Sequence, residues 1–369
     1  MRMKMGKESI KVAYLIEQCW HRNSGGTAVA AANIAEEISK FERIELIGIA
    51  ANHRKIPKRK IPENMNIVNS KLPRQILYEI WNKFNIPKAE SLVNSVDLVH
   101  ASGGAIPPTN LPMVATIHDL SWRRGNDWFP PRGKRFAETW LHKAHKAERL
   151  ICPSSATFKD LAEAGFDEKK IRIVPLGVKK VDVKDEEIEL LLEKNSLSKP
   201  FVLWVGTIEP RKNLPTLVSA MRQIPEVPLV LVGPKGWESN LQRIIEPISD
   251  RVKIIGEVDE HTKHVWYKAA TVFCFPSLME GYGLPVLEAM SHGTPVVTSS
   301  TTATAEVVHD TGLLIDPRSP DEITKAIKKL LEAPKSASEL AKKALLRSKK
   351  FTWQNTALKT VKIYREVLN

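Results

Sequence analysis

Two glutamates eight residues apart, Glu280 and Glu288, enclose a glycine-rich turn and the start of an apolar helical run, in the stretch EGYGLPVLEAMSHGTPVV. An ionised carboxylate inside such a run is costly unless something binds it, so the position of Glu288 predicts a ligand. Gly281 and Gly283 allow a close backbone approach, and Pro285 suits the first turn of a helix. Because helix N-termini bind anions, a phosphorylated ligand could rest there and present a pair of sugar hydroxyls to Glu288.

A second group of charged residues stands in VGTIEPRKNL, where Arg211 and Lys212 follow the end of a predicted strand. Two adjacent cations suit a diphosphate and could neutralise the charge that develops on it as it departs, a task that a metal ion performs in other transferases. The sequence holds no Asp-x-Asp metal pair, and the DVKD segment at 182–185 is expected to be solvated charge. We therefore predict a site that needs neither a metal nor a cofactor.

Short apolar segments that alternate with helical stretches must position these groups. In the first half of the chain the predicted strands are 12–16, 44–50, 97–102, 112–118, 149–154 and 171–177. In the second half they are 201–206, 228–233, 252–256, 271–277, 295–300 and 312–316. Such alternation is typical of α/β proteins with doubly wound parallel sheets.

The domain boundaries follow from a break in this pattern. The acidic segment 181–194 interrupts the alternation and is expected to join two domains. We predict an N-terminal domain over residues 1–180 and a C-terminal domain over residues 181–350, with a cleft between them. The last segment, 351–369, has apolar residues at helical spacing and is expected to be a helix that could cross back to the N-terminal domain.

Composition restricts the class of protein. The 369 residues are 43% hydrophobic and 26% charged, which is typical of a globular protein and not of a disordered one. The three cysteines show no metal-ligand spacing and are expected to be reduced. No apolar run of about 18 residues is present and the N-terminus does not look like a signal peptide, so we expect a cytoplasmic protein.

The positive charge is concentrated in the first half of the chain. Residues 1–180 carry 30 Lys and Arg against 18 Asp and Glu, whereas residues 181–369 carry 25 against 24. This asymmetry indicates either plain solubility or an anionic partner, namely a phosphorylated substrate, a membrane surface or nucleic acid. Because no basic motif interleaved with aromatic residues is present, we expect no nucleic-acid partner.

A basic loop at 54–60 and the segment LPRQILYEIWNKF at 72–84 bring basic residues near an apolar helical face. The face consists of Ile76, Leu77, Ile80, Trp81 and Phe84. It either packs on the core of the first domain or makes a peripheral contact with the inner face of a membrane that carries a lipid-linked acceptor.

Taken together, the motifs resemble the retaining glycosyltransferases of family 4, which have the GT-B fold of two Rossmann-like domains facing a cleft. The Glu-x7-Glu signature stands as Glu280 and Glu288, after FPS and before AMSHGTPVVTS, and the basic pair stands in EPRKN. The resemblance implies that Glu288 binds the donor ribose, that Arg211 and Lys212 hold the diphosphate, and that Glu280 and the amides of the glycine turn contact the sugar and phosphates. That turn consists of Gly281, Tyr282, Gly283 and Leu284.

In the first half, the same resemblance singles out two further positions. His118 ends the strand TIHDL, at the place where the family commonly has a histidine that contacts the sugar. A histidine at a strand end can equally bond neighbouring backbone. The glycine pair Gly25 and Gly26, before the first helix, could let the acceptor or the donor phosphates approach, or could form a simple strand–helix turn.

The resemblance implies a retaining hexosyltransferase with a nucleotide-sugar donor. The HDLSW stretch and the FPP run at 129–131 resemble the mannosyltransferase-like branch, which favours GDP-mannose as donor and a glycan or lipid-linked glycan as acceptor. Base contacts in this fold leave little trace in the sequence, so a UDP-sugar-dependent glucosyl or N-acetylglucosaminyl transferase is the alternative. In other classes, the alternatives are a non-catalytic sugar-nucleotide-binding subunit and a basic protein whose nucleic-acid binding depends steeply on salt.

Overall fold

The computed structural model describes residues 9–21, 25–125, 128–238 and 240–369, and the chain divides into two compact units. Unit 1 comprises the described residues of Met1–Trp122, Phe129–Gly177 and Trp353–Asn369. Unit 2 comprises those of Arg123–Trp128 and Val178–Thr352. The last helix of the chain therefore belongs to the unit in which the chain begins.

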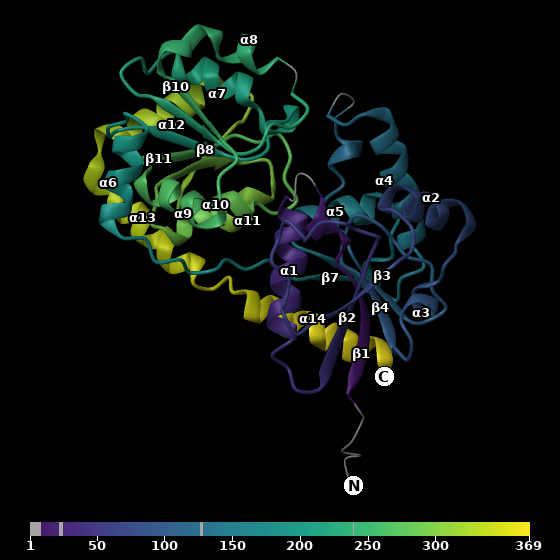
Figure 1. Ribbon diagram of the computed structural model, residues 1–369. Coiled ribbons are helices and arrows are strands. Elements are labelled where there is room, and N and C mark those ends of the chain that lie inside the picture. The colour runs from purple at the N-terminus through teal and green to yellow at the C-terminus, as the bar shows by residue number, and fades with distance from the viewer. Residues whose placement is uncertain (1–8, 22–24, 126–127, 239) are drawn as a thin grey trace. The chain divides into compact units, whose positions relative to one another are not determined.

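Within the described residues, unit 1 is built on a seven-stranded parallel sheet of order β3-β2-β1-β4-β5-β6-β7 (Figure 1). Its strands are β1 (Ile10–Leu15), β2 (Ile44–Ala50), β3 (Asn66–Asn69), β4 (Leu98–Ala101), β5 (Met113–Thr116), β6 (Arg149–Cys152) and β7 (Ile171–Ile173). Five of these lie in the predicted segments, β1 overlaps the predicted segment 12–16, and β3 was not predicted. The central strands are buried throughout, as expected when helices cover both faces of a parallel sheet.

The helices of unit 1 are α1 (Gly26–Ile38), α2 (Arg74–Phe84), α3 (Ala89–Leu92), α4 (Pro131–Ala144), α5 (Ser155–Glu163) and α14 (Trp353–Leu368). Short 3-10 helices are η1 (Glu17–Trp20), η2 (Ser121–Arg123) and η3 (Glu168–Lys170). In α2, Leu77 and Trp81 are buried in the core, whereas Ile76 is 47% exposed and Phe84 66%. The predicted apolar face is thus divided between the core and the surface, and membrane contact stays a prediction.

Unit 2 has a six-stranded parallel sheet of order β10-β9-β8-β11-β12-β13 in the described part of the chain. Its strands are β8 (Val202–Val205), β9 (Leu229–Val232), β10 (Val252–Gly256), β11 (Val272–Phe275), β12 (Val296–Ser299) and β13 (Leu313–Ile315). Each lies in a predicted segment. The helices are α6 (Asp185–Lys194), α7 (Leu214–Met221), α8 (Leu241–Ile245), α9 (Glu260–Ala269), α10 (Leu284–Ser291), α11 (Ala303–Val308), α12 (Pro320–Glu332) and α13 (Pro334–Ser348), with 3-10 helices η4 (Pro210–Lys212) and η5 (Glu246–Arg251).

The acidic segment that was expected to join the domains is mostly helix α6, which packs against α9 within unit 2. Its acidic first turn suits the positive end of a helix dipole, and the Glu187 side chain accepts from the Lys184 N–H at 2.9 Å. Glu187 also lies 2.5 Å from His261 on α9. The acidic residues therefore stabilise the N-terminus of α6 and bind it to α9, and they do not form an extended linker.

Helix α14 follows unit 2 in sequence and packs on α1 and β5 of unit 1 (Figure 1). Its buried face includes Ala357, Val361 and Tyr364, three of the residues that predicted the helical stripe. The Tyr364 hydroxyl lies 2.6 Å from His100 Nδ1 at the centre of the sheet. Among the described helices, none is both long and apolar enough to cross a membrane.

The three cysteines, Cys19, Cys152 and Cys274, are buried, and none of them forms a disulfide in the described chain. Burial raises the pKa of the Cys19 thiol to about 12, so this residue is an inert packing group at neutral pH.

Candidate active site

The glycine turn places Glu280 between the end of β11 and the start of α10. Gly283 caps α10 with a φ of 108°, and a Cβ built on it would lie 2.6 Å from Thr304 Cγ2. Glycine is favoured there for both its backbone conformation and its lack of a side chain. Pro285 lies in the first turn of α10, as predicted. The turn is buried, as are all of Gly281, Tyr282, Gly283 and Leu284.

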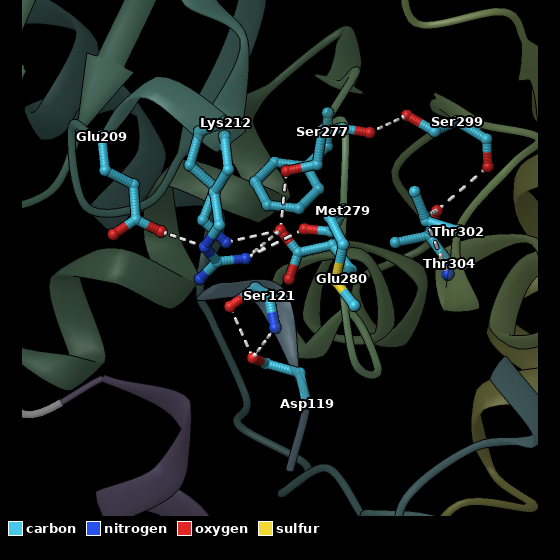
Figure 2. A network of polar contacts seen from close by, with 12 residues as sticks. Asp119, Ser121, Glu209, Lys212, Ser277, Met279, Glu280, Ser299, Thr302 and Thr304 are labelled. Atoms are coloured by element: carbon cyan, nitrogen blue, oxygen red, sulfur yellow. Dashed lines mark hydrogen bonds and ion pairs between the residues drawn. The ribbon is translucent and has the colours of Figure 1, made fainter. Parts of the chain in front are cut away.

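Hydroxyl groups of β12 and α11 hold the backbone that leads into this turn (Figure 2). The Ser299 hydroxyl donates to the Ser277 carbonyl at 2.5 Å, and the Thr304 hydroxyl donates to the Ser299 carbonyl at 3.1 Å. Thr298 donates to the Phe275 carbonyl at 2.9 Å. Two of these bonds satisfy carbonyls at the carboxyl end of β11 and one satisfies the carbonyl at the end of β12, and together they fix the backbone that carries Glu280.

Two cations of unit 2 hold Glu280. Lys212 Nζ lies 2.5 Å from Glu280 Oε1, and the Arg211 guanidinium lies 3.1 Å from the same oxygen (Figure 2). The Ser277 hydroxyl donates to that oxygen as well, at 2.6 Å. Lys212 and Glu280 are only 6% and 7% exposed. The structure therefore brings together three of the predicted residues, one glutamate of the signature and both members of the basic pair.

Burial and charge together set the protonation state of Glu280. Burial alone would raise the pKa of this carboxyl. The Lys212 ammonium and the Arg211 guanidinium lower the pKa by more than burial raises it, and the resulting pKa is about 2. Burial and the adjacent Arg211 charge lower the pKa of Lys212, against the pull of Glu280 and Glu209. Glu280 is thus ionised at neutral pH, and its carboxylate favours the charged form of Lys212 beside it.

A second buried carboxylate completes the cluster. Glu209 Oε1 lies 2.6 Å from Arg211 Nε, and Glu209 is 5% exposed. Arg211 also donates to the Met279 carbonyl at 3.0 Å, which orients its guanidinium. The Lys212 ammonium lies 4.9 Å from the centroid of the Phe275 ring. With two cations and two carboxylates, the cluster is electrically balanced by its own residues.

Glu288, the second glutamate of the signature, also has partners within the protein. Lys263 Nζ donates to its Oε1 at 2.8 Å, and the Tyr267 hydroxyl donates to its Oε2 at 2.9 Å. Both partners come from α9, which packs on α10 and is capped by the Asp259 side chain. Burial would lower the pKa of Lys263, but Glu288 and Glu260 hold it above its ordinary value. The burial of Glu288 therefore does not by itself require a ligand.

One group of potential metal ligands lies beside Glu288 in the described part of the chain. Glu260, His264 and Glu288 place ligand atoms within 4.8 Å of one another. The Lys263 ammonium lies among them, 2.8 Å from each of the two carboxylates. His264 Nδ1 lies 2.7 Å from His292 Nε2. A resident ammonium thus already supplies a positive charge to these two carboxylates.

His118 follows β5 in unit 1 and bonds neighbouring backbone. Its Nε2 donates to the Ser102 carbonyl at 3.1 Å. Burial lowers the pKa of His118, against the Ser102 carbonyl and the Asp119 charge, so the ring is neutral at pH 7 and Nδ1 carries no proton. The backbone role that the sequence left open is present, and the contact with a sugar stays a prediction.

Gly26 is the first residue of α1, and Gly25 is its N-cap. Both are exposed, and a Cβ on Gly25 would meet no atom within 4 Å. Packing therefore does not explain the glycine at position 25, and the proposed approach of a ligand to this pair stays a prediction.

Four residues of the site were not predicted from the sequence. Glu209 and Ser277 each stand within three residues of a predicted one, in EPRK and FPSLME, so their proximity was a usable signal. Lys263 and Tyr267 are one helical turn apart, but the segment EHTKHVWYKA does not single them out. They are recognised only by the contact of α9 with α10.

Two protein-family models match the chain. Residues 24–180 match the model described as Glycosyltransferase Family 4, and residues 188–347 match that described as Glycosyl transferases group 1. The second match spans the basic pair and both glutamates of the signature.

Named relatives share much of the length. O-antigen chain mannosyltransferase B of Escherichia coli is 32% identical over 265 residues, which cover 68% of this chain and 70% of that protein. The MMP alpha-(1->4)-mannosyltransferase of Mycolicibacterium hassiacum is 27% identical over 284 residues, covering 71% and 67% of the two chains.

Among solved structures, sucrose-phosphate synthase from Thermosynechococcus elongatus has the same fold. It superposes with a TM-score of 0.80 at 23% identity, covering 97% of this chain and 99% of that one. The two parallel sheets agree with this likeness. On its identity to the Escherichia coli relative and on both family models, the chain belongs to the group 1 glycosyltransferases, enzymes of the GT-B fold that transfer a hexose.

Proposed function

We propose that this glycosyltransferase transfers mannose from GDP-mannose to a glycan or lipid-linked glycan, with retention of anomeric configuration and without a metal. The observation that carries the proposal is the buried contact of Arg211 and Lys212 with Glu280 at the start of α10. The names of the Escherichia coli and Mycolicibacterium hassiacum relatives support mannose as the transferred sugar.

The cation pair would bind the donor diphosphate. A lysine ammonium has three N–H donors and a guanidinium has five, so Lys212 and Arg211 can bind phosphate oxygens and still retain Glu280. The start of α10 adds its own positive end. Glu280 would then accept hydroxyls of the transferred sugar through its second oxygen, Oε2.

Retention requires that the new bond form on the face from which the diphosphate leaves. The bond between the sugar C1 and the donor phosphate oxygen breaks, and the acceptor hydroxyl oxygen bonds to C1 on the same face. The acceptor's proton passes to the leaving phosphate, so no carboxylate nucleophile is needed. The protein contributes positioning and electrostatic stabilisation of the leaving group.

Glu288 would bind the ribose of the donor without losing its present partners. Lys263 occupies one site on Oε1 and Tyr267 one site on Oε2. A carboxylate offers about four acceptor positions, so one on each oxygen remains for a pair of ribose hydroxyls.

Metal independence rests on where the positive charge already is. Arg211 and Lys212 can stabilise the leaving diphosphate, and the Lys263 ammonium pairs with the carboxylates of both Glu260 and Glu288. Contact with the inner face of a membrane belongs to the same proposal. It is supported by the exposed Ile76 and Phe84 on α2, and sedimentation with anionic vesicles tests it.

The test is a calorimetric titration of the purified chain with GDP, UDP and ADP in the presence of a chelator. We expect GDP to bind and Glu288→Gln to weaken it about 10-fold or more, the effect of losing a charge-assisted hydrogen bond. Glu260→Gln is the matched control, because it removes the other carboxylate that pairs with Lys263 but has a side chain 46% exposed.

The outcomes separate the alternatives. Binding of UDP in place of GDP would transfer the proposal to UDP-sugars, and binding that needs a divalent cation would overturn metal independence. Nucleotide binding without turnover of any sugar would favour a non-catalytic binding subunit. No binding of any of the three nucleotides would contradict the donor site itself.

A further inference from the structure

Three polar atoms in unit 1 are buried and lack a hydrogen-bond partner among the described residues. They are Gln18 Oε1, His21 Nε2 and the Tyr78 hydroxyl. Gln18 is 1% exposed and Tyr78 is 7% exposed. Buried polar groups in native proteins are nearly always paired, so an unpaired one calls for an explanation, and a ligand is one explanation.

The backbone brings the segments that carry these atoms together at the carboxyl ends of β1 and β2. η1, which contains Gln18, follows β1, and the loop at 51–53 follows β2. The Asn52 N–H donates to the Leu72 carbonyl at 2.9 Å, which holds the start of α2, and so Arg74, against this loop. Strand order reverses between β1 and β4, and ligands of open parallel sheets bind at such a point, so η1, which follows β1, borders it.

A buried carboxylate fixes η1 to the same loop. Glu17 accepts from the Ala51 N–H at 2.7 Å and lies 2.8 Å from His53 Nε2. The Trp20 ring stacks on His53 with centroids 5.0 Å apart. Glu17 therefore has two donors in this loop, and its charge adds to burial in raising the pKa of the Tyr78 hydroxyl.

The charge of Arg74 acts on two of the groups that carry unpaired atoms, His21 and Tyr78. Burial, and after it the charge of Arg74, lower the pKa of His21 to about 4. The same arginine acts on the Tyr78 hydroxyl, where it opposes the effects of burial and of Glu17. Arg74 makes no ion pair with any residue that the structure describes. Arg74 is the first residue of α2, which has eleven residues and no side-chain cap at its N-terminus.

We propose that Arg74, His21 and Tyr78 bind a phosphate group of the acceptor substrate. A guanidinium, an imidazole N–H and a phenol hydroxyl are all donors, and the uncapped start of α2 adds amide groups and a positive dipole end. A tetrahedral oxyanion would accept hydrogen bonds from the buried His21 and Tyr78 side chains and would form an ion pair with the Arg74 guanidinium. The basic first half of the chain, 30 cations against 18 anions, would attract such a ligand.

Hydrogen bonds connect this phosphate site to His118. Gln18 Nε2 donates to the Ser102 hydroxyl at 2.6 Å, and the Ser102 carbonyl accepts from His118 Nε2 at 3.1 Å. The identification of the phosphate-bearing ligand as the acceptor rests on the proposed function and on the predicted contact of His118 with the transferred sugar. The existence of the phosphate site does not depend on it.

The experiment follows the ring of His21 by NMR in the full chain labelled with ¹⁵N-histidine. Inorganic phosphate and pyrophosphate are titrated at constant ionic strength, with chloride as the reference anion. We expect the His21 ring signals to shift saturably, and Arg74→Gln to weaken the response about 10-fold or more. Lys83→Gln is the matched control, because it removes an exposed cation from the other end of the same helix.

A second variant separates binding from folding. Tyr78→Phe removes a buried hydroxyl that has no partner in the described chain, while its ring stacking with Trp81 and Phe136 remains possible. We expect an unchanged or higher Tm together with weaker phosphate binding. No shift of the His21 signals at saturating phosphate, or equal effects of Arg74→Gln and Lys83→Gln, would overturn the proposal.

Two further measurements identify the source of the phosphate and keep the two proposals separate. If vesicles of anionic phospholipid shift the His21 signals and Arg74→Gln abolishes the shift, the phosphate belongs to a lipid. If only the soluble anions do so, it belongs to a soluble acceptor. Nucleotide binding is measured on the same sample, so GDP binding without a phosphate response would remove this site and leave the donor site standing.

Discussion

A single carboxylate oxygen, Glu280 Oε1, receives hydrogen bonds from Lys212, Arg211 and Ser277. Buried ion clusters contribute little net stability when intact, but removal of one member leaves uncompensated charge and is strongly destabilising. The cluster therefore keeps two cations in place at low dielectric, where they act on a ligand more strongly than they would in water. As a consequence, the stability of the protein depends on the ionisation of Glu280.

This dependence leads to a prediction about pH. The pKa of Glu280 is about 2 in the folded state and 4.5 ordinarily. Because the folded-state pKa is depressed, the stabilisation is complete above pH 4.5 and is lost as the pH falls toward 2. The shift corresponds to about 3 kcal/mol. We expect the free energy of unfolding to fall less between pH 5 and pH 3 in Glu280→Gln than in the wild type, as measured with urea.

The control for this measurement is Glu339→Gln, which removes an exposed carboxylate of the same unit. It should follow the pH dependence of the wild type. A wild-type curve that coincides with that of Glu280→Gln would show that this carboxylate does not titrate in the cluster as described.

At the scale of elements, the start of α10 depends on one glycine. Gly283→Ala would force a side chain into a left-handed conformation and against Thr304. We expect a loss of about 1 to 3 kcal/mol in stability from the backbone conformation, with a further loss from the steric contact. Urea unfolding measures the sum. Donor binding should weaken as well, because the same turn carries Glu280.

Gly256→Ala isolates the two contributions. Gly256 has a φ of 84° in the same unit, and a Cβ there would meet nothing within 4 Å. It should therefore show only the loss due to the backbone conformation. If Gly283→Ala costs no more than Gly256→Ala, the contact with Thr304 relaxes and does not define the turn.

The strands of both units could be predicted because each is a short apolar run in a sheet covered on both faces. β3 could not, since NIVN has polar ends, lies at the edge of the sheet and is only partly buried. The acidic segment 181–194 was predicted to join the domains, and α6 within it was not predicted, because an exposed helix with one buried position leaves a weak periodic signal.

The candidate site could be predicted in its composition but not in its contacts. The family resemblance implied that Glu280 and the basic pair share a ligand, yet Lys212 lies 68 positions from Glu280, and their ion pair follows only from the order of β8 and β11 in the sheet. The partners of Glu288 are set by the packing of α9 on α10. Such contacts depend on tertiary structure, which local spacing does not encode.

At the scale of the whole molecule, α14 joins the end of the chain to unit 1. The Tyr364 hydroxyl lies 2.6 Å from His100 Nδ1, and His100 Nε2 lies 2.8 Å from Thr116. We expect Tyr364→Phe to destabilise unit 1 by about 1 to 3 kcal/mol, because the buried His100 nitrogen loses its partner. Hydrogen exchange should accelerate in α14 and in α1, on which it packs, and not in unit 2.

Leu358→Ala provides the comparison, since Leu358 lies on the same helix and is 47% exposed. It should leave exchange in α1 unchanged. Equal protection of α1 in Tyr364→Phe and the wild type would show that the bond to His100 contributes little to the docking of α14.

The docking of α14 also fixes the order in which the two units can be completed during synthesis. Residues 178–352 of unit 2 leave the ribosome before residues 353–369, which complete unit 1. At ordinary rates of translation, roughly 10 to 40 seconds separate the synthesis of β7 from that of α14. Throughout that interval His100 and the face of α1 lack their covering helix, so the unit that is begun first is the last to be finished.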